Sequence, residues 1–327
     1  MKKVTIVLLV IIFFVTTVIV FYFWAQQGSG YLKLQLTNYY GFPATGNDSV
    51  IGVVTYNAGY LSGMENNLAV TRSGELFSGH MKRLVQQLKQ GPPVDLLAFQ
   101  EIDYGSHRSF MTDQHDAIAK HFFSYSLKAV NWDKRYVPFP YWPPSVHFGK
   151  ILSGQSVMSV WELTDPERIV LPKVASNPFY YNAFYLDRLV VSALVHHPLH
   201  PFWIMNIHAE AFDQETREKQ IRAIYRIFKE KSKHNPVILT GDFNSSPDSG
   251  EKSIHLFLDD PAVGCAAMNS GTPYPPTFPS DDPHERIDYI FYTKADFEET
   301  ASMVLTSFGT ISDHLPVYAR LKIRKGT

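Results

Sequence analysis

The sequence predicts an α+β protein in which one domain of mixed β-strands and interspersed helices follows a single N-terminal transmembrane helix. Three observations predict this fold class. The 327 residues are 45% hydrophobic and 14% aromatic, which is enough to form a sizeable core. From about residue 50 to residue 325, short apolar runs alternate with amphipathic helical patterns, without an internal repeat or a low-complexity tract. Before them, residues 4–24 form an uncharged apolar run.

The N-terminal run has the length and the flanks of a membrane anchor. At about 1.5 Å per residue, residues 4–24 make a helix of roughly 31 Å, close to the hydrocarbon thickness of a bilayer. The run ends in four aromatic residues, which suit the membrane interface. Lys2 and Lys3 favour a cytoplasmic N-terminus, so we expect a single-pass protein whose domain is extracytoplasmic. The alternative is a cleaved signal peptide, which would have a shorter apolar region ending in small residues.

We assign the anchor to residues 1–24. A linker and the first strands of the domain follow it. Residues 25–50 are polar and contain glycine, so we expect a stalk, and we place the domain at residues 51–325. The first strand of the domain is predicted over residues 51–57. The second covers residues 94–100 and ends at Glu101.

Three helices are predicted between the strands. Apolar residues at positions 81, 84, 85 and 88 have the spacing of an amphipathic helix, which stops at the Gly-Pro-Pro of residues 91–93. A second helix is predicted over residues 112–121. A third runs from Asp213 to about Lys231, with an acidic start and one apolar face.

Residues 131–148 interrupt this alternation. Four prolines are interleaved there with Phe139, Tyr141 and Trp142, a pattern that excludes a helix or a central strand. We therefore predict a stiff loop that carries aromatic side chains. The remaining strands are predicted from short apolar runs at residues 155–160, 188–195, 202–207, 237–242, 286–292, 302–305 and 315–323.

The stretch from residue 237 to 244, Val-Ile-Leu-Thr-Gly-Asp-Phe-Asn, has the pattern of a buried strand that ends in polar residues. Residues two apart on an extended segment point the same way, so Asp242 and Asn244 would face one site, with Gly241 allowing a sharp turn. In α/β sheets, ligands and catalytic groups collect at the C-terminal edge of strands. The alternative is a simple turn, because Asp and Asn are common turn residues.

Other polar side chains also occur at or near predicted strands. Asp288 lies inside an apolar run, where an unpaired carboxylate would be costly, so it needs a partner. Taken singly, these residues have structural explanations as caps, turns, ion pairs or core histidines. These side chains are Asn57, Glu101 and His208 at the ends of predicted strands, and Asp313 and His314, which follow Ile311-Ser312.

Together these segments resemble the endonuclease/exonuclease/phosphatase superfamily in order and rough spacing, over about residues 50 to 323. The resemblance implies a four-layer α/β/β/α sandwich of two mixed β-sheets and the activity of a metal-dependent phosphoric ester hydrolase. The superfamily includes deoxyribonucleases, abasic-site endonucleases, inositol polyphosphate phosphatases and neutral sphingomyelinases. The matching segments are Thr55-Tyr-Asn57, Phe99-Gln-Glu101, Asn206-Ile-His208, Gly241-Asp-Phe-Asn244, Arg286-Ile-Asp288-Tyr and Ser312-Asp-His314-Leu-Pro316.

A divalent metal is the cofactor that these residues favour. Oxygen ligands such as Glu101, with Asn57 and Asp313 nearby, suit Mg²⁺ or Mn²⁺ better than zinc. The chain has one cysteine, Cys265, so a zinc-binding cysteine cluster is excluded. By resemblance, Glu101 is the principal metal ligand. Some branches carry an aspartate where this chain has Gly59, which disfavours a second metal site.

The resemblance also implies roles in hydrolysis. Asp242 would orient or deprotonate the attacking water, and Asn244 would hold the phosphate. His314 would donate to a phosphoryl oxygen, with Asp288 fixing its tautomer and favouring its charged form. His208 would be a second phosphate donor.

Arg188 is a candidate substrate contact because it begins a predicted strand in the run Tyr-Leu-Asp-Arg-Leu. The alternative is a surface arginine that pairs with Asp187.

Charge and anchoring bear on the substrate. The formal net charge is −1, and without the first thirty residues, whose only charges are Lys2 and Lys3, 28 basic residues face 31 acidic ones. This balance does not favour a nonspecific nuclease, which depends on phosphate neutralisation. The anchor and the aromatic loop favour phospholipid headgroups. The alternatives for the loop are an active-site rim and a cover over a sheet edge.

Two other functions remain open: an extracytoplasmic nuclease acting on DNA or RNA, and an inactive binding module. The intact set of polar residues argues against the inactive module. No pattern indicates an obligate protein partner.

Overall fold

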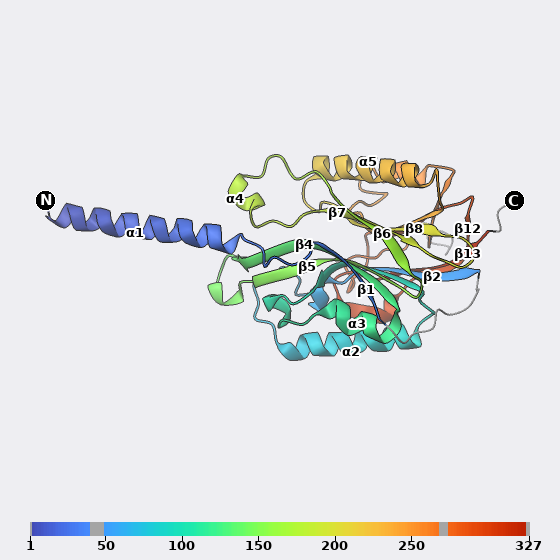
Figure 1. Cartoon of the computed structure of the whole chain (residues 1–327), viewed down its shortest axis with the longest axis horizontal. Helices are drawn as coiled ribbons and strands as arrows, with labels where there is room; N and C mark the ends of the chain where they lie inside the picture. The colour runs from blue at the N-terminus through green and yellow to red at the C-terminus, as the bar shows by residue number, and fades with distance from the viewer. Residues whose placement is uncertain (1, 40–48, 268–273, 325–327) are drawn as a thin grey trace.

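The computed structural model shows two mixed β-sheets packed face to face, with helices outside them and one long helix projecting from the domain (Figure 1). It describes residues 2–39, 49–267 and 274–324. The seven-stranded sheet has the order β1 (Leu34–Asn38), β4 (Tyr125–Val137), β5 (Gly149–Ser159), β3 (Leu96–Asp103), β2 (Val50–Asn57), β13 (Val317–Ile323) and β12 (Phe297–Val304). The six-stranded sheet has the order β10 (Val263–Cys265), β11 (Asp288–Thr293), β9 (Val237–Asp242), β8 (Phe202–His208), β7 (Leu189–Val195) and β6 (Leu163–Val170).

The helices complete four layers. Alternate residues of β2 show the arrangement: Val53 joins the core between the sheets, whereas Val54 packs with the helices outside. Apolar residues of α2 and α3 cover the seven-stranded sheet, and those of α5 and α6 cover the other. The predicted α/β/β/α sandwich is therefore confirmed. The helices are α1 (Lys2–Ala25), α2 (Gly74–Gln90), α3 (Gln114–Phe122), α4 (Phe179–Asn182), α5 (Gln214–Lys231) and α6 (His255–Leu258), with 3-10 segments η1 (Gly59–Leu61), η2 (His107–Ser109), η3 (Pro144–Val146) and η4 (Thr306–Ile311).

Side-chain caps define where the main helices begin. Ser73, Asp113 and Asp213 precede α2, α3 and α5, and each side chain accepts a hydrogen bond from a backbone N–H of the first turn. Such a cap satisfies a donor that has no partner within the helix, and contributes about 1 kcal/mol. These caps place the starts within two residues of the predicted ones for α3 and α5.

Two parallel strand pairs bring the polar strand ends together. β2 runs parallel to β3 in one sheet, and β8 runs parallel to β9 in the other. Because parallel strands end at the same edge of a sheet, Asn57 lies beside Gln100, and His208 lies beside Asp242. The antiparallel strand β11 starts opposite Asp242, with Asp288 directly across from it. Both sheets therefore present their polar ends at one place.

The proline-rich loop is shorter than predicted. Residues 131–137 complete β4 by pairing with β5, and the strand ends directly before Pro138. Because β1 pairs only with residues 125–129 of β4, the rest of β4 forms an edge of the sheet. The prolines therefore determine the end of the strand, and residues 138–148 form the loop, apart from η3.

Part of the predicted stalk belongs to the sheet. Residues 34–38 form β1, which pairs antiparallel with β4, whereas residues 40–48 of the stalk lie outside the described residues. β3 continues past its predicted end at Glu101. Strands β6 and β10 are not predicted from the sequence, because β6 is polar and β10 has only three residues. Pairing with the neighbouring strands, and not an apolar pattern of their own, makes these segments extended.

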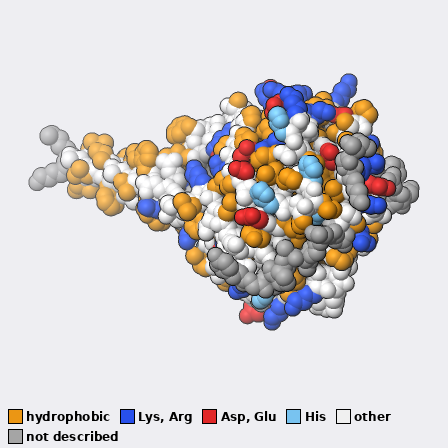
Figure 2. All heavy atoms as spheres, turned by 45° about the vertical axis from the view of Figure 1, so that its right-hand side comes forward, with side chains coloured by type: hydrophobic (Ala, Val, Ile, Leu, Met, Phe, Trp, Pro, Cys, Tyr) orange, Lys and Arg blue, Asp and Glu red, His pale blue; other side chains and the backbone are white. Residues whose placement is uncertain are grey.

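Helix α1 is long and apolar enough to cross a membrane. It projects from the domain and is covered by hydrophobic side chains, in contrast to the mixed surface of the domain (Figure 2). Its last turn contacts the domain: the Tyr22 ring lies 5.6 Å from that of Phe184, and the Phe21 ring lies 5.6 Å from that of Tyr136. Ala25 is fully buried. The foot of the helix is therefore packed against the domain.

Buried His115 on α3 is expected to make stability depend on pH. Its ring hydrogen bonds with Ser156 Oγ (2.7 Å) and Ser126 Oγ (2.8 Å), and burial, followed by the charge of Lys128, lowers its pKa to about 3. Because the folded pKa lies below the usual 6.5, the stability contributed by neutral His115 is complete above pH 6.5 and is lost as the pH falls toward the folded value. The unfolding free energy should therefore decrease by up to about 1.4 kcal/mol per pH unit in this window.

Denaturant titrations of the full chain in detergent test this expectation. His115→Gln should flatten the acid slope, whereas His121→Gln, at an exposed position of the same helix, should leave it unchanged. Equal slopes for wild type and His115→Gln would show that another group causes the acid sensitivity.

Candidate active site

Asn57, at the end of β2, connects the polar strand ends of the two sheets. Its Nδ2 donates to Asp242 Oδ2 at 2.9 Å, and lies 3.4 Å from both Glu101 Oε1 and His314 Nε2. Its Oδ1 accepts from the backbone N–H of Gly59 at 3.1 Å. Asn57 therefore presents its amide N–H groups to the site, and its predicted role as an oxygen ligand stays a prediction.

A buried hydrogen-bond network below the site holds the sheets in register. Gln100 Nε2 donates to Asn206 Oδ1 at 2.6 Å, and Asn206 Nδ2 donates to the backbone oxygens of Phe99 (2.8 Å) and Ser156 (3.0 Å). Asn206 lies on β8, while the other three lie on β3 and β5. The asparagine of the Asn-Ile-His segment is thus a link between sheets and does not line the site.

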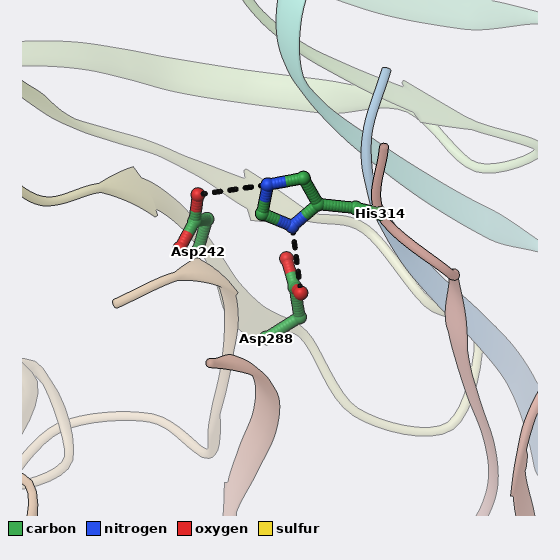
Figure 3. Close-up of side chains that lie close together, drawn as sticks. All are labelled: Asp242, Asp288 and His314. Atoms are coloured by element: carbon green, nitrogen blue, oxygen red, sulfur yellow. Dashed lines mark hydrogen bonds and ion pairs between the residues drawn. The ribbon is translucent and has the colours of Figure 1, made fainter. Parts of the chain in front are cut away.

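Asp242, Asp288 and His314 form a buried triad (Figure 3). His314 Nδ1 lies 3.0 Å from Asp288 Oδ2, and its Nε2 lies 3.9 Å from Asp242 Oδ2. Thr277 Oγ1 donates to Asp288 Oδ2 at 2.6 Å. Asp288 therefore has the partner that its place in an apolar strand required.

The triad favours a charged histidine. Burial by itself lowers the pKa of His314, but the Asp288 carboxylate, followed by Asp242, outweighs it and raises that pKa to about 10. Burial, and then repulsion from Asp288, raises the pKa of Asp242 to about 7. His314 is thus a cationic hydrogen-bond donor, and Asp242 is a carboxylate that can take up a proton near neutral pH.

Close backbone packing explains why the Gly-Asp-Phe-Asn segment begins with glycine. A Cβ on Gly241 would lie 2.2 Å from the backbone oxygen of Ile207, so only glycine lets β9 approach β8 here. Asn244 has a left-handed backbone with φ of 49°, which asparagine tolerates. Its backbone N–H donates to Asp242 Oδ1 at 2.8 Å, and its Nδ2 donates to the backbone oxygen of Ala209 at 3.1 Å. Asp242 is therefore held in one orientation.

Glu101, Asp313 and Asn66 make up the part of the site that can hold a metal. Glu101 lies in an irregular stretch of β3 with φ of 49°, where the register to β5 shifts. Asn66 Nδ2 lies 3.1 Å from Asp313 Oδ2 and 3.5 Å from Glu101 Oε2, and Asn66 Oδ1 is buried without a hydrogen-bond partner. In the described part of the chain, no lysine or arginine forms an ion pair with either carboxylate. Two carboxylates without a lysine or arginine ion pair among the described residues, together with an orphaned amide oxygen, fit a Mg²⁺-like ion.

Gly59 lies directly against this group. With φ of 46°, it has a backbone that favours glycine, and a Cβ would lie 2.8 Å from Asp313 Oδ1. An aspartate at this position would be strained and would meet a second carboxylate. The departure from the aspartate of other branches therefore fits the local packing around Asp313.

Arg188 is buried in the site, and the alternative of a surface pair with Asp187 is wrong. Asp187 instead pairs with Arg168 and Lys173. Arg188 Nη1 donates to His208 Nε2 at 2.6 Å, and its Nε lies 3.6 Å from Glu210 Oε2. Arg188 directly precedes β7 and lies next to His208, because Leu189 and His208 are opposite each other in the β7–β8 register.

Burial and the contact with Arg188 together determine the protonation and the tautomer of His208. Burial, followed by the charges of Arg188 and His314, lowers the pKa of His208 well below its usual value, so the ring is neutral. Because an arginine can only donate, His208 Nε2 accepts and its proton lies on Nδ1. Because His208 Nε2 accepts a hydrogen bond, it carries no proton to donate to a phosphate. Arg188 does carry N–H groups that can donate. The role of His208 as a phosphate donor stays a prediction.

One cavity of about 980 Å³ contains these groups. Glu101, Asp242 and His314 lie on its wall, as do Asn66 and Arg188. Sequence reasoning missed Asn66 and Thr277, which lie in segments without an apolar period or a motif. Only the folded chain brings Asn66 to Glu101 and Asp313, and Thr277 to Asp288.

The chain belongs to the endonuclease/exonuclease/phosphatase family, whose sequence model matches residues 54–314. Members of this family are phosphoesterases and nucleases and generally depend on a divalent metal. No curated protein matches the sequence at a significant level.

Solved structures share the fold. An endonuclease/exonuclease/phosphatase from Beutenbergia cavernae has 20% identity and a TM-score of 0.59, covering 84% of this chain and 72% of that chain. The catalytic domain of human Nocturnin, with a bound sulfate anion, has 14% identity and a TM-score of 0.59, covering 89% and 98%. TDP2 from D. rerio, complexed with a single-strand DNA product, has 15% identity and a TM-score of 0.56, covering 84% and 99%.

Proposed function

We propose that the chain is a membrane-anchored, Mg²⁺-dependent phosphodiesterase or phosphatase that acts on phospholipid headgroups. The observation that carries the chemistry is that one cavity is lined both by Glu101 and Asp313, which share Asn66, and by the Asp242–His314 pair. Residues 4–24 are the proposed anchor, with the N-terminus cytoplasmic and the active site on the extracytoplasmic side. The slight excess of acidic over basic residues favours this substrate over nucleic acid.

The side chains can be assigned to an in-line hydrolysis. Asp242 takes a proton from water as the water oxygen bonds to phosphorus, and the ester P–O bond opposite it breaks. His314, held by Asp288, donates through Nε2–H to a phosphoryl oxygen, and Arg188 and Asn244 donate to the other oxygens. The leaving oxygen takes a proton from solvent. A metal ion held by Glu101, Asp313 and Asn66 would neutralise charge on the phosphoryl oxygens.

Metal dependence is the first test of this function. The full chain in detergent should hydrolyse bis(p-nitrophenyl) phosphate or p-nitrophenyl phosphate with Mg²⁺ and lose this activity in EDTA. Phosphatidylcholine, sphingomyelin and plasmid DNA, compared side by side, then identify the substrate. Nicking of plasmid with untouched lipid would establish the nuclease alternative, and no turnover of any ester would establish an inactive module.

Metal binding itself is expected to stabilise the fold. At Mg²⁺ concentrations about 100 times the dissociation constant, the gain is about 2.7 kcal/mol, which raises the thermal midpoint by several degrees. Glu101→Gln should abolish this rise, whereas Glu298→Gln, at an exposed position on β12, should retain it. The same rise in both variants would remove Glu101 from the metal site.

A further inference from the structure

The cavity lined by Asp242 and His314 extends to the foot of α1. Its wall includes Tyr22 from the last turns of that helix, together with Phe139 from the proline-rich loop and Phe184 from the segment after α4. Tyr22 and Phe184 are in ring contact. A residue of α1, the proposed anchor, therefore lines the same cavity as Asp242.

Exposed aromatic side chains lie beside this opening on two separate segments. We call them the aromatic rim: Tyr141 and Trp142 in the proline-rich loop, and Phe179 and Tyr180 in α4. Their side chains are 58–78% exposed, although large aromatic side chains are usually buried. The end of the β4–β5 hairpin and α4 lie at the same end of the domain as the foot of α1, and β12 lies at the opposite end (Figure 1).

The helix determines where the bilayer meets the domain. As the proposed anchor, the apolar part of α1, roughly 31 Å long, would fill the hydrocarbon layer and place the membrane surface at its C-terminal aromatic turn. Trp24 there is 44% exposed. Aromatic side chains at that level favour the headgroup region, where an apolar ring and a polar edge are both accommodated. Exposed Arg135, whose backbone N–H donates to the backbone oxygen of Gln27, adds positive charge at this level.

We infer that the aromatic rim rests in the headgroup layer of the bilayer, so that the cavity opens directly onto the membrane surface. The occupant is a phosphate ester of an amphiphile, taken from the bilayer without leaving it. Its phosphate reaches Asp242 and His314, while its apolar part lies against Tyr22, Phe139 and Phe184. The reaction rests on the catalytic part of the proposed function, and the seating of the rim rests only on its membrane anchor.

Spin labels test the seating without any activity. On a Cys265→Ser background, which removes the one native cysteine, labels are attached to Trp142→Cys, Phe179→Cys and Met303→Cys. Met303 is an exposed position on β12, far from the rim. The full chain is reconstituted in phosphatidylcholine vesicles containing phosphatidylglycerol. Relaxation by membrane-soluble oxygen should exceed relaxation by a water-soluble nickel chelate at positions 142 and 179, and the reverse should hold at 303. Labels at 142 and 179 that behave like the label at 303 would overturn the inference.

Activity then tests the route of the substrate. Trp142→Glu and Phe179→Glu should lower hydrolysis of lipid in vesicles at least tenfold and leave hydrolysis of a water-soluble phosphodiester unchanged. Met303→Glu is the matched control and should change neither rate. Unchanged lipid hydrolysis in both rim variants would overturn the membrane route. A wild-type chain that hydrolyses neither ester would refute the proposed function, while the spin labels would still decide the seating of the rim.

Discussion

Asp242→Asn is expected to lower the rate of phosphate ester hydrolysis by a factor on the order of 10³, with no loss of stability. Asparagine keeps the shape of the side chain but cannot accept a proton from water. It also cannot fulfil the electrostatic role of a carboxylate next to His314. The rate is measured with a soluble phosphodiester at saturating Mg²⁺.

The stability of this variant distinguishes a catalytic role from a structural one. Asp242 is fully buried and lies across from a second buried carboxylate, Asp288, so its charge is costly in the fold. Removing that charge should leave the thermal midpoint unchanged or raise it, as expected for a residue that is retained for function. Asp260→Asn, which removes a partner of Lys229 and Tyr225 away from the site, should keep full activity. A variant Asp242→Asn that retains activity would refute the proposed role.

Asp288→Asn is expected to reduce activity by a factor on the order of 10³ to 10⁴, although Asp288 is not expected to contact the substrate. Its Oδ2 accepts from His314 Nδ1 at 3.0 Å and from Thr277 Oγ1 at 2.6 Å. Without this acceptor, His314 loses the partner that fixes its tautomer and orientation. The loss should appear in kcat more than in KM, because the donated hydrogen bond strengthens in the transition state.

A double-mutant cycle tests whether Asp288 acts through His314. If the two residues form one unit, Asp288→Asn combined with His314→Gln should cost no more than the more severe single change. Thermal unfolding of all three variants identifies any variant that fails to fold. Losses that multiply in the double variant would mean that Asp288 acts independently of His314.

Segments with a regular local pattern could be predicted from the sequence. The apolar period places α2 and α5, and the run before Asp242 places β9. Asp242 and Asn244 line the same cavity, but strand alternation does not bring them together: β9 ends at Asp242, and a left-handed backbone at Asn244 turns its N–H toward Asp242 Oδ1. The burial of Asp288 in an apolar strand correctly required a partner, which the structure supplies as His314.

Features that depend on a distant neighbour could not be predicted in this way. Residues 34–38 are extended because β4 offers them a free edge, and residues 131–137 are extended because β5 pairs with them. The irregular backbone at Glu101 arises from a register shift with β5. In each case the partner strand, and not the residue's own preference, determines the conformation.

The sequence by itself determined the apolar helix, the class of fold and most of the polar residues of the site, because each depends on short-range periodicity or on motifs that keep their order along the chain. Only the tertiary structure decided that Asn66 lies next to Glu101 and Asp313. It also decided that Arg188 donates a hydrogen bond to Nε2 of His208, and that Tyr22 of α1 lines the cavity. These contacts join residues far apart in the chain, and their geometry exists only once both sheets are packed.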